Sequence, residues 1–434
     1  MKKKATMALA PQASINAADT AWMMTSTALV LLMTLPGIAL FYAGMVRRKN
    51  VLATMAAVVA IASTVSLTWF AVGYSLAFTE GWPWLGGSGR FWFSGFDYLK
   101  EAGQLAVSHV APNVPESVYA MFQLTFAIIT TALVLGAFVE RMRFSAILWF
   151  ALLWSVLVYA PVAHWVWEPG GWLAQMGALD FAGGSVVHVN AGIAGLVCAY
   201  ALGSRKGYGR EAFEPYNLAF TMTGAGLLWV GWFGFNAGSA VAADGRAGLA
   251  MLVTHIAAAA GAMSWMLGEW IVRRSPSLLG LCSGLVAGLV AITPAAGFVT
   301  PPAALAIGAI AGLACYWGAT GLKHLLGADD SLDVFGVHGV GGIVGALLTG
   351  VFNTQALGGP GLVGDWVTAS VVSNGIGAQV WIQLKGVLLT IVWSGVVAFI
   401  AFKIADLTIG LRVSEEEERE GLDISSHGET AYNR

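Results

Sequence analysis

The sequence predicts an all-α polytopic membrane protein of eleven transmembrane helices, in which an inverted five-helix repeat is followed by a final helix. Three observations lead to this fold class. The 434 residues are 57% hydrophobic and 11% charged, which is not the composition of a soluble chain. Eleven apolar runs are long enough to cross a hydrocarbon core of ~30 Å. Two histidine-containing segments, five runs apart, resemble each other in sequence.

The eleven expected spans lie between charged, proline or glycine breaks. The 55 glycines of the chain indicate helices whose backbones approach closely. The expected spans are residues 22–45, 51–78, 118–139, 145–165, 184–203, 217–239, 248–272, 278–296, 303–324, 332–352 and 380–402.

Basic residues in the short loops predict an orientation with the N-terminus outside and the C-terminus inside. An odd number of spans places the two termini on opposite sides of the membrane. The loops on one side contain Arg90, Lys100 and Arg246. The loops that share a side with the C-terminus contain Arg47, Arg48, Lys49, Arg141, Arg143, Arg205, Lys206, Arg210, Arg273, Arg274 and Lys323. This excess marks the cytoplasmic side. Lys2 to Lys4 argue against an outside N-terminus unless a leader is removed.

These spans divide the chain into seven regions. They are an N-terminal segment with features of a leader remnant (1–21), a first five-helix repeat (22–203), a cytoplasmic linker (204–216), a second five-helix repeat (217–352), an extracellular loop (353–379), the eleventh helix (380–405) and a cytoplasmic regulatory tail (406–434).

Composition excludes several classes of function. The net charge of −2 and the absence of a basic run in the body leave no surface for nucleic acid. Cys198, Cys282 and Cys315 lie singly in apolar stretches without CxxC spacing, so neither a disulfide framework nor a structural zinc site is supported. We expect no metal, no cofactor and no enzymatic activity.

The internal repeat is visible in the segments VHVNAGIAG at 187–195 and VHGVGGIVG at 337–345. Aspartates precede both, Asp180 in the first and Asp333 in the second. Because five spans separate the copies, the second enters the membrane from the opposite side. Inverted repeats meet near the midplane of transporters. His188 and His338 are therefore predicted neighbours.

Ionisable residues at membrane depth are functional candidates by default. A neutral imidazole is both donor and acceptor, so two adjacent rings can share a hydrogen bond and still present polar atoms to a passing molecule. The alternative is a pair of hydrogen-bonded core histidines. His255, which has no repeat mate, is expected to be a packed or hydrogen-bonded histidine. Two histidines without a neighbouring cysteine or carboxylate make a poor metal site.

Aromatic residues cluster near the outer ends of the third, fourth and sixth spans. Phe122 and Phe126 are four residues apart, hence on one helix face, as are Phe235 and Ser239. Together with Trp167, expected in the outer loop after the fourth span, they predict an aromatic mouth that attracts a small cation through the ring quadrupoles, at ~0.5 to 2 kcal/mol per ring. Ordinary core packing is the alternative reading.

Asp180 stands a few residues before the fifth span, in LDFAGGSVVH. A carboxylate in this position can cap a helix N-terminus. It can also act as a buried counter-charge for a cation at the mouth, and both roles remain open.

The sequence resembles the ammonium transporter family (Amt/Mep/Rh) and is most similar to its bacterial Amt type. The resemblance covers nearly the whole chain, in PGIALFYAGMVRRKN from 36, GALDFAGGSVVHVNAGIAGLV from 177, WFGFNAGSA from 232, DVFGVHGVGGIVG from 333 and the tail ADLTIGLRVSEEEEREGLD. It implies an eleven-span homotrimer in the bacterial cytoplasmic (inner) membrane that takes part in nitrogen assimilation, with one narrow hydrophobic pore per subunit.

The resemblance also implies roles for individual residues. Trp167, Phe126 and Ser239 correspond to the external recruitment site, with Asp180 supporting it. Phe126 and Phe235 correspond to the gate, and His188 and His338 to the paired pore histidines. The remaining pore residues are Phe122 and Gln123 beside the mouth and Trp232 below the gate. One departure is visible after Trp167, where Glu168-Pro169 replaces the usual glycine run.

The expected function is ammonium and ammonia transport. Ammonium is recruited at the mouth and deprotonated, and ammonia passes the histidine pair, with proton transfer as a separate open question. The resemblance further implies that a PII-type signal-transduction protein contacts the tail. The alternatives are an ammonium sensor that signals through the tail and a passive channel for ammonia or carbon dioxide. A membrane enzyme is disfavoured because no nucleophile or metal set accompanies the histidines.

Overall fold

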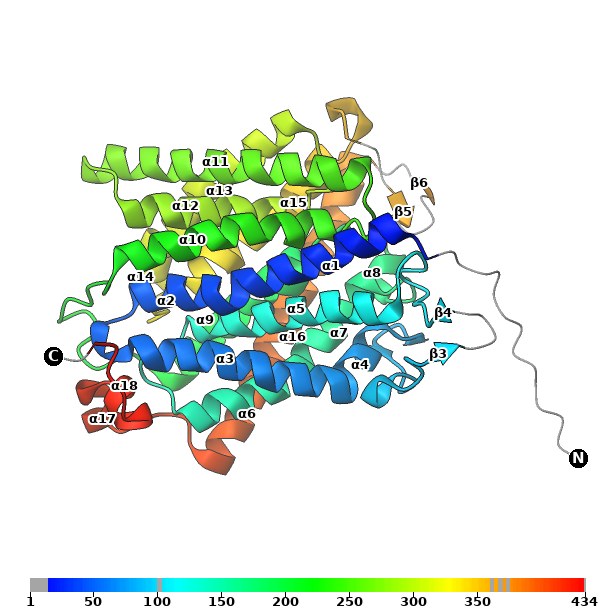
Figure 1. The fold of residues 1–434 in the computed structure, drawn as a ribbon. Coiled ribbons are helices and arrows are strands. Elements are labelled where there is room, and N and C mark those ends of the chain that lie inside the picture. Colours follow the sequence, from blue (N-terminus) through cyan, green and yellow to red (C-terminus); the bar gives the residue numbers. More distant parts are fainter. Residues whose placement is uncertain (1–14, 100–103, 360–362, 366–369, 372–374, 433–434) are drawn as a thin grey trace, which may run out of the picture.

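The computed structural model describes residues 15–99, 104–359, 363–365, 370–371 and 375–432. Ten long apolar helices and one shorter one run side by side in these residues (Figure 1), which accounts for all eleven expected spans. The leader-like segment 1–21 falls largely outside the described residues, as does part of the loop 353–379.

The first five-helix repeat begins at Ala17 and ends at Leu202. Its elements are α1 (Ala17–Leu32), η1 (Met33–Ile38), α2 (Ala39–Met45), η2 (Arg48–Asn50), α3 (Val51–Thr68), η3 (Trp69–Gly73), α4 (Tyr74–Phe78), α5 (Glu116–Leu135), α6 (Phe144–Trp154), η5 (Ser155–Tyr159), α7 (Ala160–Trp167), α8 (Trp172–Gln175), η6 (Gly184–Val189) and α9 (Asn190–Leu202).

The second repeat begins at α10, whose first turn is capped by the side chain of Asn217, which accepts from the backbone N–H of Ala219 and Phe220. Its elements are α10 (Leu218–Trp232), η7 (Phe233–Ala237), α11 (Gly245–Arg273), α12 (Leu278–Ile292), α13 (Pro301–Trp317), η8 (Gly318–Leu322), α14 (Lys323–Leu326), η9 (Phe335–Gly339) and α15 (Val340–Phe352).

Three short antiparallel strand pairs lie at one end of the bundle (Figure 1), where the loops connect successive spans. They are β1 (Gly81–Trp82) with β2 (Leu85–Gly86), β3 (Tyr98–Leu99) with β4 (Gln104–Leu105), and β5 (Val363–Asp365) with β6 (Ser370–Val371), and the 3-10 turns η4 (Phe91–Phe93) and η10 (Gln355–Leu357) are the other short elements.

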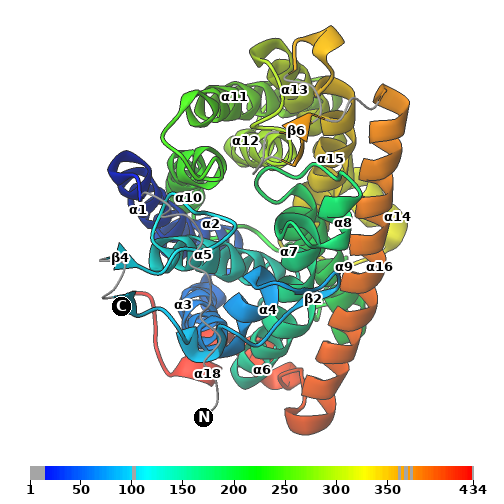
Figure 2. The ribbon, with the colours of Figure 1, turned by 90° about the vertical axis from the view of Figure 1, so that its right-hand side faces the viewer.

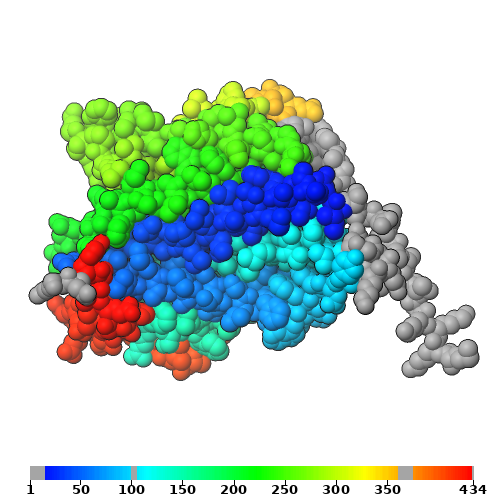
Figure 3. All heavy atoms as spheres, viewed as in Figure 1, coloured from blue at the N-terminus to red at the C-terminus, as the bar shows by residue number. Residues whose placement is uncertain are grey.

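The eleventh helix lies outside the repeat. α16 (Ile376–Ile409) crosses the side of the bundle in the view along the helices (Figure 2) and packs against α15, α9 and α6. The tail then forms α17 (Glu415–Glu420) and α18 (Leu422–His427). The space-filling view shows the tail in red against the end of the bundle opposite the strands (Figure 3).

Two repeat-related spans are shorter than the sequence predicted. The third and eighth spans end at Leu135 and Ile292, whereas residues 136–139 and 293–296 were expected to be helical. Both segments form turns instead. Gly136 follows the first helix, and Pro294, which lacks a backbone N–H, follows the second.

Short π-helical segments interrupt three pairs of repeat-related spans. η1 and η7 occupy the first and sixth spans, η5 and η8 the fourth and ninth, and η6 and η9 the fifth and tenth. A π turn inserts an extra residue and is frequent at functional sites. Because His188, Phe235 and His338 all lie in such segments, the interruptions set the directions of the central side chains.

Glycines allow the two histidine-bearing segments to cross at close range. A Cβ on Gly192 would lie 2.4 Å from both the backbone N and the Cα of Gly339. A Cβ on Gly342 would lie 2.9 Å from the backbone N of Val189. Gly192 and Gly342 each follow their histidine by four residues, so the repeated Val-His-x-x-x-Gly pattern encodes the crossing.

Candidate functional site

Three aromatic rings from three spans form the outer part of a central column. The rings of Phe126 on α5 and Phe235 in η7 stack with centroids 4.1 Å apart and planes at 23°. Trp167 contacts Phe126 edge-on, at 5.7 Å and 87°. Phe122 lies against Phe126 at 4.9 Å. Phe126 therefore contacts both Trp167 and Phe235, as the sequence predicted for an aromatic mouth, and Phe122 packs against Phe126.

Above this stack lies a small pocket of about 10 Å³, close to the room that one water-sized species requires. It is lined by Gln123, Phe126, Trp167, Phe181, Ser239 and Val241. The Ser239 hydroxyl donates to the carbonyl of Phe235 at 2.8 Å, which leaves its oxygen lone pairs as acceptors. The buried Oε1 of Gln123 has no partner among the described residues. The pocket thus combines aromatic rings with acceptor oxygens.

Trp167 is the last residue of α7 and is buried, whereas the sequence placed it in the loop after the fourth span. The helix continues past the predicted end at residue 165 because all residues of its last turn are buried and apolar or aromatic apart from His164. The indole Nε1 donates to the carbonyl oxygen of Asp180 at 2.9 Å. This bond fixes the ring at the pocket.

Asp180 caps the segment that contains His188. One carboxylate oxygen accepts from the backbone N–H of Gly183 and Gly184 at 2.9 and 2.5 Å, and the other from Ser185 and Val186 at 2.8 and 3.2 Å. The capping geometry considered from the sequence is present. Its carboxylate satisfies four backbone donors that a helix N-terminus otherwise leaves without partners.

The repeat mate of Asp180 is Asp330 and not Asp333, the residue paired with it from the sequence. Asp180 and Asp330 each precede their histidine by eight residues, and Asp330 accepts from the backbone N–H of Phe335 at 2.7 Å. Asp333 instead has a left-handed backbone, with φ of 58°, and its mate Gly183 has φ of 112°. Asp333 binds Lys323 at 2.7 Å. The order of residues alone was misleading because three aspartates, Asp329, Asp330 and Asp333, precede the second histidine.

The two repeated histidines lie below the stacked phenylalanines. Nδ1 of His188 and Nδ1 of His338 are 3.2 Å apart, and the ring planes are 20° from parallel, so the predicted contact is present. Trp232 stacks on His188 at 5.5 Å, and its indole N–H donates to Thr293 at 2.9 Å. Nε2 of His188 is buried without a partner among the described residues.

Two residues of this column were not singled out in the sequence. Phe181 lines the outer pocket and follows Asp180 directly, a neighbourhood that could have signalled it. Thr293 orients Trp232 from a turn that the sequence assigned to a helix, so no pattern pointed to it. His255, expected to be packed or hydrogen-bonded, is packed on Trp229 at 5.0 Å and is exposed on the surface of the subunit.

Comparison with known proteins identifies the family of this chain. A sequence model described as the Ammonium Transporter Family matches residues 21–432. The chain belongs to the ammonium transporter family. It is 48% identical to the ammonium transporter of Bacillus subtilis, over 95% of this chain and 98% of that protein. It is 49% identical to the ammonium transporter of Aquifex aeolicus, over 98% and 96% of the two chains.

Solved structures of family members have the same fold. The Mep2 structure from Saccharomyces cerevisiae superposes with a TM-score of 0.84 at 34% identity, over 97% of this chain and 94% of that one. A structure described as a sensor Amt protein gives a TM-score of 0.83 at 27% identity, over 94% and 98% of the chains. This member of the ammonium transporter family is thus a multi-pass membrane protein whose function is ammonium transport.

At the end of the transporter opposite the mouth, a buried ion-pair cluster joins the two repeats. Arg205 binds Glu140 and Asp329, each at 2.7 Å, and Arg47 binds Glu140 at 3.1 Å. Burial alone would raise the pKa of Glu140, but Arg205 and Arg47 outweigh burial and hold this pKa below its ordinary value. Burial would also raise the pKa of Asp329, but its hydrogen bonds and ion pair with Arg205 outweigh burial and lower this pKa. Sequence reasoning missed this cluster because its members are far apart in the chain.

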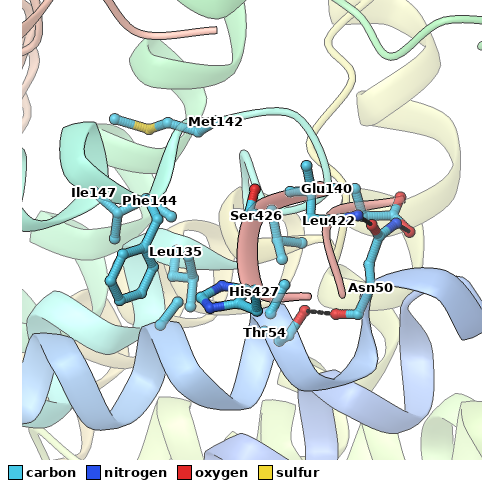
Figure 4. Close-up of a pocket in the computed structure, with 13 residues that line it drawn as sticks. Asn50, Thr54, Leu135, Glu140, Met142, Phe144, Ile147, Leu422, Ser426 and His427 are labelled. Carbon is cyan, nitrogen blue, oxygen red and sulfur yellow. Dashed lines mark hydrogen bonds between the residues drawn. The ribbon is translucent and has the colours of Figure 1, made fainter. Parts of the chain in front are cut away.

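The transporter's tail is seated beside this cluster. Leu422 and His427 enter a pocket formed by the ends of α3, α5 and α6 (Figure 4), where the ring of His427 contacts Phe144 edge-on at 5.0 Å. Asp423 accepts from the backbone N–H of Ala53 in the first turn of α3 at 2.8 Å. The buried carboxylate of Glu418 binds Arg412 at 2.8 Å. The acidic tail is therefore packed, although its composition alone equally suited a solvated segment.

Proposed function

We propose that each subunit captures ammonium at the outer pocket, removes its proton at the phenylalanine gate and conducts ammonia past the histidine pair. The observation that best supports this is the column itself. Stacked Phe126 and Phe235 separate a pocket with acceptor oxygens from a buried histidine pair. A cation gains ring-quadrupole and hydroxyl contacts above the gate and loses them below it.

The apolar column supplies the selectivity. A bare cation that enters a buried apolar passage loses its hydration at a large free-energy cost, whereas a neutral molecule does not. Ammonium avoids this cost by leaving its proton behind, and potassium has no proton to lose. In this proposal Phe126, Trp167 and Ser239 form the recruitment site. Gln123 and Phe122 border it.

Below the gate, His188 and His338 meet the dehydrated ammonia. The Nε2 atom of His188, which has no partner among the described residues, is available to it. Trp232 forms the adjoining wall and is held by Thr293. Asp180 supports the site from both sides, since it caps the segment of His188 and its carbonyl fixes Trp167.

We propose the following setting for the transporter. The subunit works as a homotrimer in the bacterial inner membrane, with the strand-bearing end outside and the C-terminus in the cytoplasm. The eleven basic residues in the loops at the tail's end, against three at the other end, support this orientation. Its role there is nitrogen assimilation.

The tail, residues 406–434, serves in this proposal as a regulatory element that a PII-type signal-transduction protein contacts. Its docking supports such a role. Asp423 accepts from the backbone N–H of Ala53, and Glu418 accepts from that of Lys206, which follows Arg205 of the cluster, so displacement of the tail breaks both bonds. Deletion of residues 414–434 is expected to change the uptake rate or abolish binding of the PII-type protein. Unchanged uptake and unchanged binding would contradict the regulatory role.

Growth rescue tests the transport mechanism. A transporter-deficient bacterium on low ammonium should grow when it expresses the wild-type chain and should grow poorly with His188→Ala, His338→Ala or Ser239→Ala. Protein amounts in the membrane are matched by immunoblot. No rescue by well-expressed wild type would favour the sensor alternative, which the likeness to a sensor Amt structure keeps open.

Current recordings separate the two modes of transport. Proteoliposomes that contain the wild type are exposed to a pulse of ammonium. A current indicates that the separated proton, or its charge, crosses with ammonia. Uptake without a current indicates the passive gas channel.

A further inference from the structure

Glu168, the residue that follows Trp167, is buried and bound to a second outer loop. Only 2% of its surface is exposed. One carboxylate oxygen lies 2.8 Å from Nε2 of His109, and the other accepts from the backbone N–H of Gly170 at 2.5 Å. The carboxylate is thus committed to two partners and does not face the outer solution as a free charge.

The two residues of this pair belong to the loops that flank the mouth. Glu168 directly follows α7, whose last residue is Trp167. His109 lies in the loop between β4 and α5, and α5 contains Gln123 and Phe126. That loop is tied to the start of α5 by the bond from the N–H of Glu116 to the carbonyl of Ala106, at 2.8 Å.

The pair therefore spans the two elements that contribute the facing rings of the recruitment pocket. Trp167 meets Phe126 edge-on at 5.7 Å, and this contact forms one wall of the pocket. The indole is fixed on its inner side by the carbonyl of Asp180. The bond between Glu168 and His109 holds the residue that directly follows Trp167 in the chain.

We infer that Glu168 and His109 are positioning residues that hold Trp167 against Phe126 and thereby set the apparent affinity for ammonium. The inference rests on the proposed recruitment site. It assigns a role to the Glu168-Pro169 segment, which departs from the glycine run expected after Trp167. The pair acts through the tryptophan and touches neither the gate nor the histidines.

The test measures uptake by proteoliposomes as a function of ammonium concentration. Glu168→Ala and His109→Ala are expected to raise the half-saturating concentration roughly three- to tenfold and to leave the maximal rate within about twofold. The double variant is expected to match the single ones, because either change already breaks the bond. Glu168→Gln keeps one acceptor oxygen for the Gly170 N–H, and its NH₂ group can donate to Nε2 of a neutral His109. This variant is therefore expected to stay near wild type.

Two further comparisons show whether the pair acts through Trp167. In a Trp167→Leu background, His109→Ala is expected to cause no additional change in half-saturation. Glu80→Gln is the matched control, because Glu80 lines the same surface hollow as His109 and is not part of the turn after Trp167. It is expected to behave as wild type.

Several results would overturn the inference. They are an unchanged half-saturating concentration in both alanine variants, effects that multiply in the double variant, a further shift in the Trp167→Leu background, and a Glu168→Gln variant as impaired as Glu168→Ala. The last result would show that the negative charge of Glu168, and not its hydrogen bonds, sets the half-saturating concentration. Failure of the wild type to take up ammonium is a separate outcome that contradicts the transport proposal. The same variant comparisons are then made on ammonium binding to the purified protein by calorimetry.

Discussion

Each histidine of the central pair uses Nδ1 to bind its partner, at 3.2 Å. When both rings are neutral, one Nδ1 is the donor and the other is the acceptor. The two Nε2 atoms then differ, since the ring that accepts at Nδ1 has an N–H at Nε2 and the other ring has a lone pair there. A neutral pair therefore presents one donor and one acceptor, and in the proposed mechanism these meet ammonia, which can itself both donate and accept.

The distance between the histidines depends on a residue without a side chain. Gly192→Ala would place a Cβ 2.4 Å from the backbone of Gly339, which has no flexible atoms to move aside. Overpacking of this kind costs roughly 1–3 kcal/mol, and the strain falls on the contact of the histidines. We expect uptake by Gly192→Ala to fall at least roughly tenfold, or the folded protein to be lost from the membrane.

The matched control is Gly386→Ala in α16, where an added Cβ meets no atom within 4 Å. It should resemble wild type in both amount and rate. Uptake by Gly192→Ala at the wild-type rate and amount would contradict the importance of the crossing.

At the scale of elements, the ion-pair cluster joins the loop after α5 to the linker after α9 and to the loop before η9. Arg205 binds Glu140 and Asp329, and the side chain of Glu140 is fully buried. The segment from Asp329 leads through Asp330 into η9 and His338. The cluster therefore fixes the segment that leads to His338.

Glu140→Gln should destabilise the detergent-solubilised transporter at pH 7 by roughly 3 kcal/mol, because it removes the charged partner of Arg47 and one of the two carboxylates that Arg205 binds. The folded pKa of Glu140 lies below its ordinary value, which is about 4.3. Its contribution is therefore fully present above pH ~4.3 and is lost as the pH falls through the lowered folded pKa.

Thermal unfolding at pH 3 to 7 measures this effect. The melting temperatures of wild type and Glu140→Gln should differ at pH 7 and converge below about pH 4. Asp406→Asn removes the partly exposed pair with Lys403 and serves as control, with little change expected. A constant difference across the pH range would show that the charge of Glu140 is not the cause.

The docking of the tail depends on a cap supplied from another element. Asp423 in α18 accepts from the N–H of Ala53 in the first turn of α3, and the loss of such a cap costs roughly 1 kcal/mol. Asp423→Ala should therefore increase the rate at which a protease cuts the tail in detergent solution. Glu416→Ala, at an exposed position of α17, should leave the rate unchanged. Equal cutting of both variants and wild type would contradict the cap.

At the scale of the whole molecule, hydrophobic length and the repeat predicted most of the fold. All eleven spans were found, because a helix that crosses a bilayer must be long and apolar. The contact of His188 with His338 followed from repeat symmetry. The π segments and the cluster around Glu140 were not predictable, since each depends on packing between residues distant in the sequence. The early end of α12 has a local signal in Pro294, which was passed over because the apolar run continues to residue 296. The pairing of Asp180 with Asp333 was wrong, because several aspartates precede the second histidine and the motif alone does not show which of them caps the helix.

The column lies where the two repeats meet, which gives a prediction for the separated halves. A chain cut after Arg210, at an exposed position of the linker, leaves His188 in one fragment and His338 in the other. Neither fragment expressed alone should restore growth on low ammonium. Co-expressed fragments should restore it in part, because Arg205 of the first still binds Asp329 of the second. Growth with one fragment alone would contradict a site shared by both halves.

The crossing of Gly192 with Gly339 and of Gly342 with Val189 also constrains how this sequence can change. A larger residue at Gly192 or Gly342 displaces the backbone of the other repeat. A substitution in one repeat therefore disturbs both repeats. Duplication usually frees one copy to diverge. Here the backbones of the two duplicated segments are in direct contact, and each segment restricts the residues that the other can accept.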